Sequence, residues 1–274
     1  RSQELPVWLG IPVLGLFMAE QPIFCQRVFV FVTAITFSML HVLLLNDWGD
    51  LQKNPYEEKK FPSGINQKEF IRWIGRTAIG AYLICIVLFS FLGPLPVLLA
   101  LMGGAMSFLY SHPGIHLKEN LIGSTVLHLL GGAIQFLLGY IAFGAPVQSG
   151  VLIALFFSLI FAAGHFVHMC LDVNEDRKGN IQTWATRFDL SAILSTALVV
   201  FVCAHIYLYI LLICQIIAPP MFYIFLLPLL IHALFYQNLR RNNIAQNTIA
   251  QYRFRYRWGY AVCTIGYILW TLKP

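Results

Sequence analysis

Charged side chains are scarce in this sequence. Of its 274 residues, 18 are Lys or Arg and 12 are Asp or Glu, together 11% of the chain, while apolar residues make up 58%. Soluble domains average about 25% charged and about 45–50% apolar residues. So few charges cannot cover the surface of a water-soluble fold of this size, and so apolar a chain is not intrinsically disordered. The composition therefore indicates an integral membrane protein.

The sequence also lacks closely spaced cysteines. Its six cysteines are scattered, mostly within apolar runs, and no two have the spacing of a metal or redox motif. We interpret them as small core residues.

A signal-peptide pattern is missing too, because Pro6 and Pro12 interrupt the first apolar stretch and no cleavage-like site follows it. We therefore expect neither a disulfide framework nor a cleaved leader.

Long apolar runs predict the architecture. A helix needs about 20 apolar residues to cross the hydrocarbon core of a bilayer. We expect an all-α integral membrane protein with about nine transmembrane helices, forming a single domain over residues 1–274. The runs lie at residues 5–19, 22–45, 73–92, 94–110, 121–142, 148–171, 190–213, 217–238 and 256–272.

The charged residues are distributed unevenly about these spans. With the N-terminus in the cytosol, 16 of the 18 basic and 11 of the 12 acidic residues fall on the cytosolic side, as the positive-inside rule predicts for the basic ones. This asymmetry explains the net charge of +6 without nucleic acid, and no obligate protein partner is evident. Long polar loops occur on that side alone, so we expect function there. The loops with motifs lie at about 46–72, 111–120 and 172–189.

Two acidic motifs follow the second and sixth spans. Asn46 and Asp50 are four residues apart in the first, and Asp172 and Asp176 have the same spacing in the second. Side chains four residues apart share one face of a helix, so each motif directs its oxygen ligands one way. Mg²⁺ prefers such ligands and is usually completed by substrate phosphates. The motifs predict a magnesium site for a diphosphate; the alternative is two solvated helix ends.

Basic residues near the motifs are candidate partners for that diphosphate. Lys118 follows the turn Tyr110-Ser111-His112-Pro113, and Arg177 and Lys178 directly follow Asp176. A cation at such a place can contact phosphate oxygens directly. The alternative is that these are ordinary basic loop residues on the cytosolic side.

In these residues the sequence resembles the UbiA-type superfamily of intramembrane prenyltransferases. Three family features occur here in order and at matching spacing over nearly the whole chain: N-D-x-x-D-x-x-x-D, a Y-S-x-P turn with a following Lys, and D-x-x-x-D-R-K with a Thr seven residues after its second Asp. The matching residues are Asn46, Asp47, Asp50, Tyr110, Ser111, Pro113, Lys118, Asp172, Asp176, Arg177, Lys178 and Thr183.

The resemblance implies nine helices around a central cavity, with the motif loops as its cytosolic cap. It also implies two Mg²⁺ ions that hold an isoprenyl diphosphate, whose ionisation gives an allylic cation for an acceptor to attack. The implied roles are metal ligation by Asn46, Asp50, Asp172 and Asp176, support of the site by Asp47, and diphosphate binding by Tyr110, Lys118, Arg177 and Lys178.

The sequence departs from the family pattern at several positions. Asn54 replaces the third acid of the first motif, and Lys59-Lys60 replace the Arg-Pro of the R-P-L-P-S-G-like stretch that ends at Gly64. Leu5-Pro6 stand where the family often has Arg-Pro, and the glycine of the second motif is shifted to Gly179. These departures leave the identity of the acceptor open.

Polar side chains within the spans are candidates for a cavity that binds the acceptor. Intramembrane polar residues usually face the interior of a helix bundle. His165 and His168 form an H-x-x-H-x-x-x-D string with Asp172, which is also compatible with a catalytic base or a transition-metal ligand set. The cavity candidates are His41, His128, Gln135, His165 and His168.

The sequence thus predicts a Mg²⁺-dependent intramembrane prenyltransferase that moves an isoprenyl group from its diphosphate to a small aromatic or lipid-like acceptor. A terpene cyclase on the same scaffold is the first alternative, because it differs only in how the cation is quenched. A membrane transporter is a remote alternative: transporters place charges near the bilayer centre, whereas these acids lie at helix ends.

Overall fold

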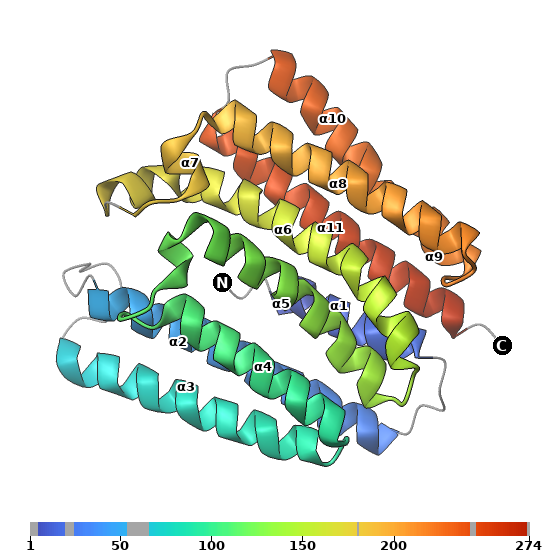
Figure 1. The fold of residues 1–274 in the computed structure, drawn as a ribbon, viewed down its shortest axis with the longest axis horizontal. Helices are drawn as coiled ribbons and strands as arrows, with labels where there is room; N and C mark the ends of the chain where they lie inside the picture. The colour runs from blue at the N-terminus through green and yellow to red at the C-terminus, as the bar shows by residue number, and fades with distance from the viewer. Residues whose placement is uncertain (1–4, 20–24, 54–65, 180, 242–244, 273–274) are drawn as a thin grey trace. The chain divides into compact units, whose positions relative to one another are not determined.

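A computed structural model describes residues 5–19, 25–53, 66–179, 181–241 and 245–272, and within these ranges every regular element is a helix (Figure 1). The α-helices are α1 (Leu5–Met18), α2 (Cys25–Lys53), α3 (Gln67–Ser90), α4 (Pro94–Ser111), α5 (Leu121–Ala142), α6 (Val147–Lys178), α7 (Trp184–Arg187), α8 (Leu190–Ile213), α9 (Pro219–Ile224), α10 (Leu227–Arg241) and α11 (Gln246–Thr271), and a 3₁₀ turn, η3, covers Leu117–Glu119.

Seven helical segments in the described part of the chain are long and apolar enough to cross a membrane: α2, α3, α4, α5, α6, α8 and the α9–α10 segment Pro219–Asn238. The shorter apolar α1 and the 26-residue α11 bring the total close to the expected nine. Large apolar side chains such as Leu83, Val199 and Leu230 are exposed, as lipid-facing residues are. The predicted all-α, multi-pass membrane fold is confirmed.

The chain divides into two compact units. Unit 2 covers residues 22–118, and unit 1 combines residues 1–21 with residues 119–274. In unit 2, α2 packs along α3, and α4 packs against both. Gly93, with a φ of +133°, turns the chain between α3 and α4, and Pro94 begins α4 where a missing N–H costs nothing.

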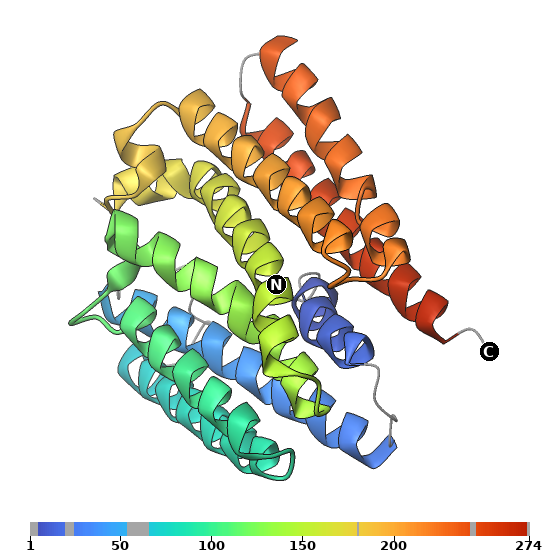
Figure 2. The ribbon, with the colours of Figure 1, turned by 45° about the vertical axis from the view of Figure 1, so that its right-hand side comes forward.

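Unit 1 is arranged around α6, which packs against α5, α8 and α11, while α1 packs against α5 and α11 (Figure 2). Glycines allow the closest of these approaches. A Cβ on Gly139 of α5 would overlap the backbone oxygen of Pro12 in α1, and one on Gly132 would lie 2.6 Å from the backbone oxygen of Phe157 in α6. Small residues at such crossings let membrane helices pack backbone to backbone.

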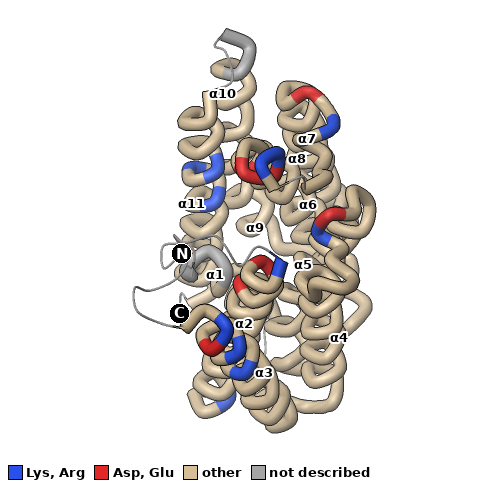
Figure 3. Tube along the Cα trace, turned by 90° about the vertical axis from the view of Figure 1, so that its left-hand side faces the viewer, with Lys and Arg blue, Asp and Glu red and all other residues tan. Residues whose placement is uncertain are grey.

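Two helices continue beyond the predicted spans. The apolar run ends near residue 45, yet α2 continues to Lys53; likewise α6 continues to Lys178. Residues 46–53 of the first motif and 172–178 of the second therefore lie on helical turns rather than in loops. In each unit, Lys, Arg, Asp and Glu gather toward helix ends, in unit 2 where α2 ends and α3 begins and in unit 1 where α6 ends (Figure 3).

Candidate functional site

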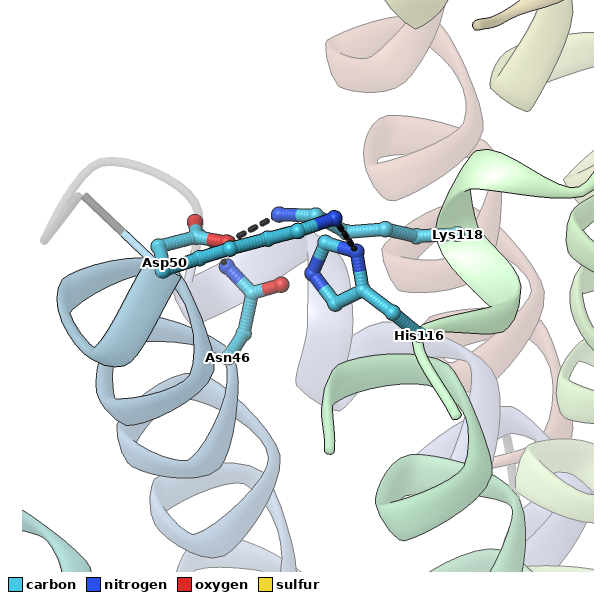
Figure 4. Close-up of polar contacts among 5 residues, drawn as sticks. Asn46, Asp50, His116 and Lys118 are labelled. Atoms are coloured by element: carbon cyan, nitrogen blue, oxygen red, sulfur yellow. Dashed lines mark hydrogen bonds and ion pairs between the residues drawn. The ribbon is translucent and has the colours of Figure 1, made fainter. Parts of the chain in front are cut away.

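The first motif occupies the last two turns of α2. Asn46 and Asp50 lie on one helix face as predicted, and the Asn46 amide Nδ2 donates to Oδ2 of Asp50 at 3.4 Å (Figure 4). Both residues, and Asp47 beside them, are partly buried. The helix supplies two oxygen-bearing side chains at one point, held four residues apart by its backbone.

Lys118 lies against this pair. Its ammonium group forms an ion pair with Oδ1 of Asp50, and the side chains of Lys118 and Asp50 are only 16% and 22% exposed. Lys118 reaches Asp50 from η3, so the turn after α4 and the end of α2 meet at the carboxylate (Figure 4). The structure therefore brings together three of the predicted site residues of unit 2, and it shows that Asp50 accepts a cation here.

A second contact joins the same two segments. Nζ of Lys53 lies 3.0 Å from Nδ1 of His116, a buried residue with a φ of +45°. Histidine adopts this left-handed conformation more readily than most residues do. Neither residue was among those predicted from the sequence. Lys53 follows Asp50 by three positions and so shares its helix face, which was a usable signal; the partner of Lys53 depends on tertiary structure.

Tyr110 lies in the last turn of α4, partly buried, next to Ser111. This end of α4 is fixed closely against α2, because a Cβ on Gly49 would overlap the backbone oxygen of Ser111. Gly49 belongs to the first motif, so the motif's glycine provides the space in which α4 approaches. The position of Tyr110 is thereby tied to the helix that carries Asp50.

The second motif occupies the last turns of α6 in unit 1. Asp172 and Asp176 are partly buried on one face, and Arg177 and Lys178 are exposed at the helix end. The Thr183 hydroxyl donates to Oδ2 of Asp176 at 3.3 Å. This is the threonine that the family resemblance singled out, and it holds the Asp176 carboxylate from the segment that follows α6.

The segment after α6 is anchored on α5. Thr183 and Thr186 form a reciprocal capping box at the start of α7, and the Trp184 indole donates to the backbone oxygen of Leu121 at 2.9 Å. The capping box satisfies backbone donors at the helix start that would otherwise lack partners. Thr183, and through it Asp176, is therefore placed by α5 as well as by α6.

Three histidines of unit 1 lie on α5 and on the part of α6 that precedes the second motif. Nδ1 of His168 lies 3.3 Å from Oδ2 of Asp172, and both side chains are nearly half exposed. His165 is buried and stacks on His128, with ring centroids 3.7 Å apart. Among the described residues, no group of three or more His, Cys, Asp or Glu side chains converges on a metal position. In the H-x-x-H-x-x-x-D string, His168 therefore lies beside Asp172, whereas His165 stacks on His128.

The remaining cavity candidates differ in their surroundings. His41 is buried in the packing of α2 on α3, where Nδ1 lies 3.0 Å from the backbone oxygen of Ala78 and the ring stacks on Tyr82. Gln135 lies on α5, and its Oε1 is buried without a hydrogen-bond partner. Asn54 and the stretch Lys59–Gly64, which carry departures from the family motif, lie outside the described residues.

The donor set at each motif fits a hard divalent cation. Asn46 and Asp50 offer amide and carboxylate oxygens, and Asp172 and Asp176 offer carboxylate oxygens, which are the ligands Mg²⁺ takes. Neither motif alone supplies the six ligands of an octahedral ion. Mg²⁺ usually keeps several waters, and substrate phosphates complete its coordination. A site of this kind therefore needs fewer than six protein ligands.

These features define a multi-pass helical membrane protein with oxygen-rich acidic helix ends. The chain belongs to the UbiA prenyltransferase family, whose sequence profile it matches over residues 8–258. The resemblance seen in the sequence motifs is thereby confirmed. No curated protein matches the chain.

Solved structures share the fold. One from work on digeranylgeranylglyceryl phosphate synthase in membranes has a TM-score of 0.71 and 16% identity, covering 99% of this chain and 100% of that one. A UbiA homologue from Archaeoglobus fulgidus, bound to DMAPP and Mg²⁺, has a TM-score of 0.70 and 14% identity, covering 97% and 96%. A UbiA homologue from Aeropyrum pernix K1 has a TM-score of 0.70 and 16% identity, covering 96% and 98%. At these identities the likeness concerns the fold.

Proposed function

We propose that this protein is a Mg²⁺-dependent intramembrane prenyltransferase, which moves an isoprenyl group from an isoprenyl diphosphate to a small aromatic or lipid-like acceptor. The observation that carries the proposal is the pair of oxygen-donor sets at the ends of α2 and α6 in a member of this family. The Archaeoglobus fulgidus relative bound to DMAPP and Mg²⁺ supports the choice of donor and metal.

In this proposal the two units act as one transmembrane domain with the motifs on its cytosolic side. Two Mg²⁺ ions, when bound, would neutralise charge on the leaving diphosphate as the C–O bond breaks. The residues that would hold them are Asn46, Asp50, Asp172 and Asp176. Asp47 supports the first of these sets, and Thr183 keeps the Asp176 carboxylate oriented through its hydroxyl.

Cationic and phenolic side chains would bind the diphosphate. Lys118 exchanges its ion pair with Asp50 for the phosphate oxygens, so that the Asp50 carboxylate becomes free for the metal. Lys53 lies on the same face of α2 as Asp50, where its Nζ contacts His116. It would leave this contact and bring a second ammonium group to the diphosphate. Tyr110 donates its hydroxyl, and Arg177 and Lys178 provide positive charge at the end of α6.

Replacing Lys118 with Met tests this exchange. The loss of a charge-assisted hydrogen bond, about 1.5–3 kcal/mol, should weaken Mg²⁺-dependent binding of geranyl diphosphate by about 10- to 100-fold. Binding of Mg²⁺ without donor should not weaken, because Asp50 loses a competing cation. Lys68→Met, at an exposed position in the first turn of α3, is the matched control and should leave both affinities unchanged. Unchanged donor affinity in Lys118→Met would remove Lys118 from the diphosphate site.

Product analysis tests the proposed function as a whole. The purified protein in detergent is incubated with Mg²⁺ and isoprenyl diphosphates of 10 to 20 carbons, with and without a panel of phenolic and lipid-like acceptors. A transferase forms a prenylated acceptor and releases diphosphate in step with it. Release of a cyclic hydrocarbon or terpene alcohol from donor alone would instead identify a cyclase, and the absence of any Mg²⁺-dependent turnover would refute both.

A further inference from the structure

Unit 1 holds buried polar groups that the donor site does not use. His165 is 5% exposed, and neither of its ring nitrogens has a hydrogen-bond partner. Oε1 of Gln135 is likewise buried and without a partner. A buried polar group left unpaired costs about 1–3 kcal/mol, and native proteins pair nearly all of them. These groups therefore point to a ligand that hydrogen-bonds with them.

Close packing of α5 on α6 brings the groups together. The helices approach most closely at Gly132, where a Cβ would lie 2.6 Å from the backbone oxygen of Phe157. One turn away His128 stacks on His165, with an angle of 13° between the rings. The backbone oxygen of Ser124 lies 2.8 Å from Nδ1 of His128 and fixes its ring. The stacked rings place the nitrogens of His165 beside the polar face of α5.

That face of α5 has open space at its centre. His128, Gly131 and Gln135 follow one another at intervals of three and four residues and so share a face. A Cβ added to Gly131 would meet no heavy atom within 4 Å, whereas one added to the neighbouring Gly132 would collide with α6. The open space over Gly131, called the hollow below, thus lies between two polar side chains of α5, and His165 of α6 stacks on the first of them.

The charge of the surroundings restricts the ligand. The sequence of α5 contains no Asp, Glu, Lys or Arg, and that of α6 contains none before Asp172. Neither helix would therefore supply a fixed positive charge to a carboxylate bound between them, and burying an uncompensated charge is costly. Imidazole and amide groups both donate and accept hydrogen bonds, which suits a neutral hydroxyl.

We infer that the hollow lined by His128, Gly131, Gln135 and His165 binds the reactive end of an uncharged, hydroxyl-bearing acceptor. The inference rests on the proposed prenyl transfer and specifies its second substrate. His165 precedes Asp172 by seven residues, about 10 Å along α6. An acceptor held there would stand about that distance along α6 from Asp172, one of the proposed metal ligands.

The test compares two probes that differ in charge. Binding of 4-hydroxybenzyl alcohol and of 4-hydroxybenzoate is measured by equilibrium dialysis on the full chain, with Mg²⁺ and the unreactive donor geranyl thiodiphosphate. We expect saturable binding of the alcohol and at least tenfold weaker binding of the carboxylate. Carboxylate binding as tight as that of the alcohol, or no saturable binding of the alcohol, would overturn the inference.

Two variants locate the binding. His165→Phe keeps a ring on His128 but removes both nitrogens, and Gly131→Leu fills the hollow. Each should weaken binding of the alcohol at least tenfold while Mg²⁺-dependent donor binding stays within about twofold. Gly80→Leu, at a glycine of α3 that also has open space, is the control and should change neither.

The readouts separate two kinds of failure. Unchanged alcohol binding in both His165→Phe and Gly131→Leu would overturn the acceptor site and leave the prenyl-transfer proposal intact. Absence of Mg²⁺-dependent donor binding in the unaltered protein would refute prenyl transfer itself, and with it the acceptor assignment.

Discussion

Asp176→Asn should reduce Mg²⁺-dependent binding of geranyl diphosphate by about 100- to 1,000-fold. The substitution removes one negative charge from the site, worth about 3–4 kcal/mol next to a cation at the effective dielectric of a partly buried site. The shape of the side chain is kept, and the asparagine oxygen can still accept the Thr183 hydroxyl bond. The effect is therefore expected in metal-dependent binding rather than in folding. Equilibrium dialysis with radiolabelled donor, with and without Mg²⁺, measures it.

Glu175→Gln is the matched control for this loss. It changes charge by the same amount one position earlier on α6, but its side chain is exposed. Donor binding should stay within about twofold of the unaltered protein, and both variants should have the same thermal stability. If Asp176→Asn binds donor with full Mg²⁺ dependence, or if Glu175→Gln loses binding equally, Asp176 is not a metal ligand.

Gly139→Val should lower the thermal stability of the protein in detergent by roughly 6–12 °C. A Cβ at this position overlaps the backbone oxygen of Pro12 and approaches the Leu16 nitrogen to 2.9 Å, so α1 must move away from α5. Backbone atoms cannot yield as a flexible side chain does, and overpacking of this kind costs about 3 kcal/mol. Thermal unfolding followed by circular dichroism or by aggregation measures the shift.

Gly131→Ala on the same helix is the control for this prediction. Its Cβ would meet no atom within 4 Å, and alanine favours a helix over glycine by about 1 kcal/mol. Its thermal stability should be equal or higher. If both variants lost the same amount of thermal stability, any substitution of a glycine in α5 would be destabilising. The loss in Gly139→Val could then not be assigned to the close crossing of α1 and α5.

Local features of the site were predictable because they follow from helix periodicity. The spacing of Asn46 and Asp50 predicted a shared face, and their side chains are hydrogen-bonded. The continuation of α2 through the first motif was harder to predict from the sequence, because the hydropathy of the chain falls after residue 45. No proline occurs in the sequence between residue 46 and Pro55, so nothing local ends the helix before that region.

Contacts between segments distant in sequence could not be predicted in the same way. The ion pair of Lys118 with Asp50 joins residues 68 positions apart, and the Lys53–His116 contact joins residues 63 apart. Likewise, the sequence predicted His41 as a polar side chain within an apolar span, but not that its Nδ1 lies beside the backbone oxygen of Ala78 in the neighbouring helix. Composition and periodicity identify polar residues within spans, and only tertiary structure supplies their partners.

Equilibrium binding of geranyl diphosphate to the unaltered protein tests the central claim most directly. The measurement is made on the purified protein in detergent, with Mg²⁺, with Ca²⁺ in its place, and with excess chelator. We expect saturable binding with Mg²⁺ that falls at least tenfold with chelator, because in the proposed mechanism the metal links the acidic helix ends to the diphosphate. Binding of equal affinity with and without Mg²⁺, or no saturable binding in any condition, would contradict it.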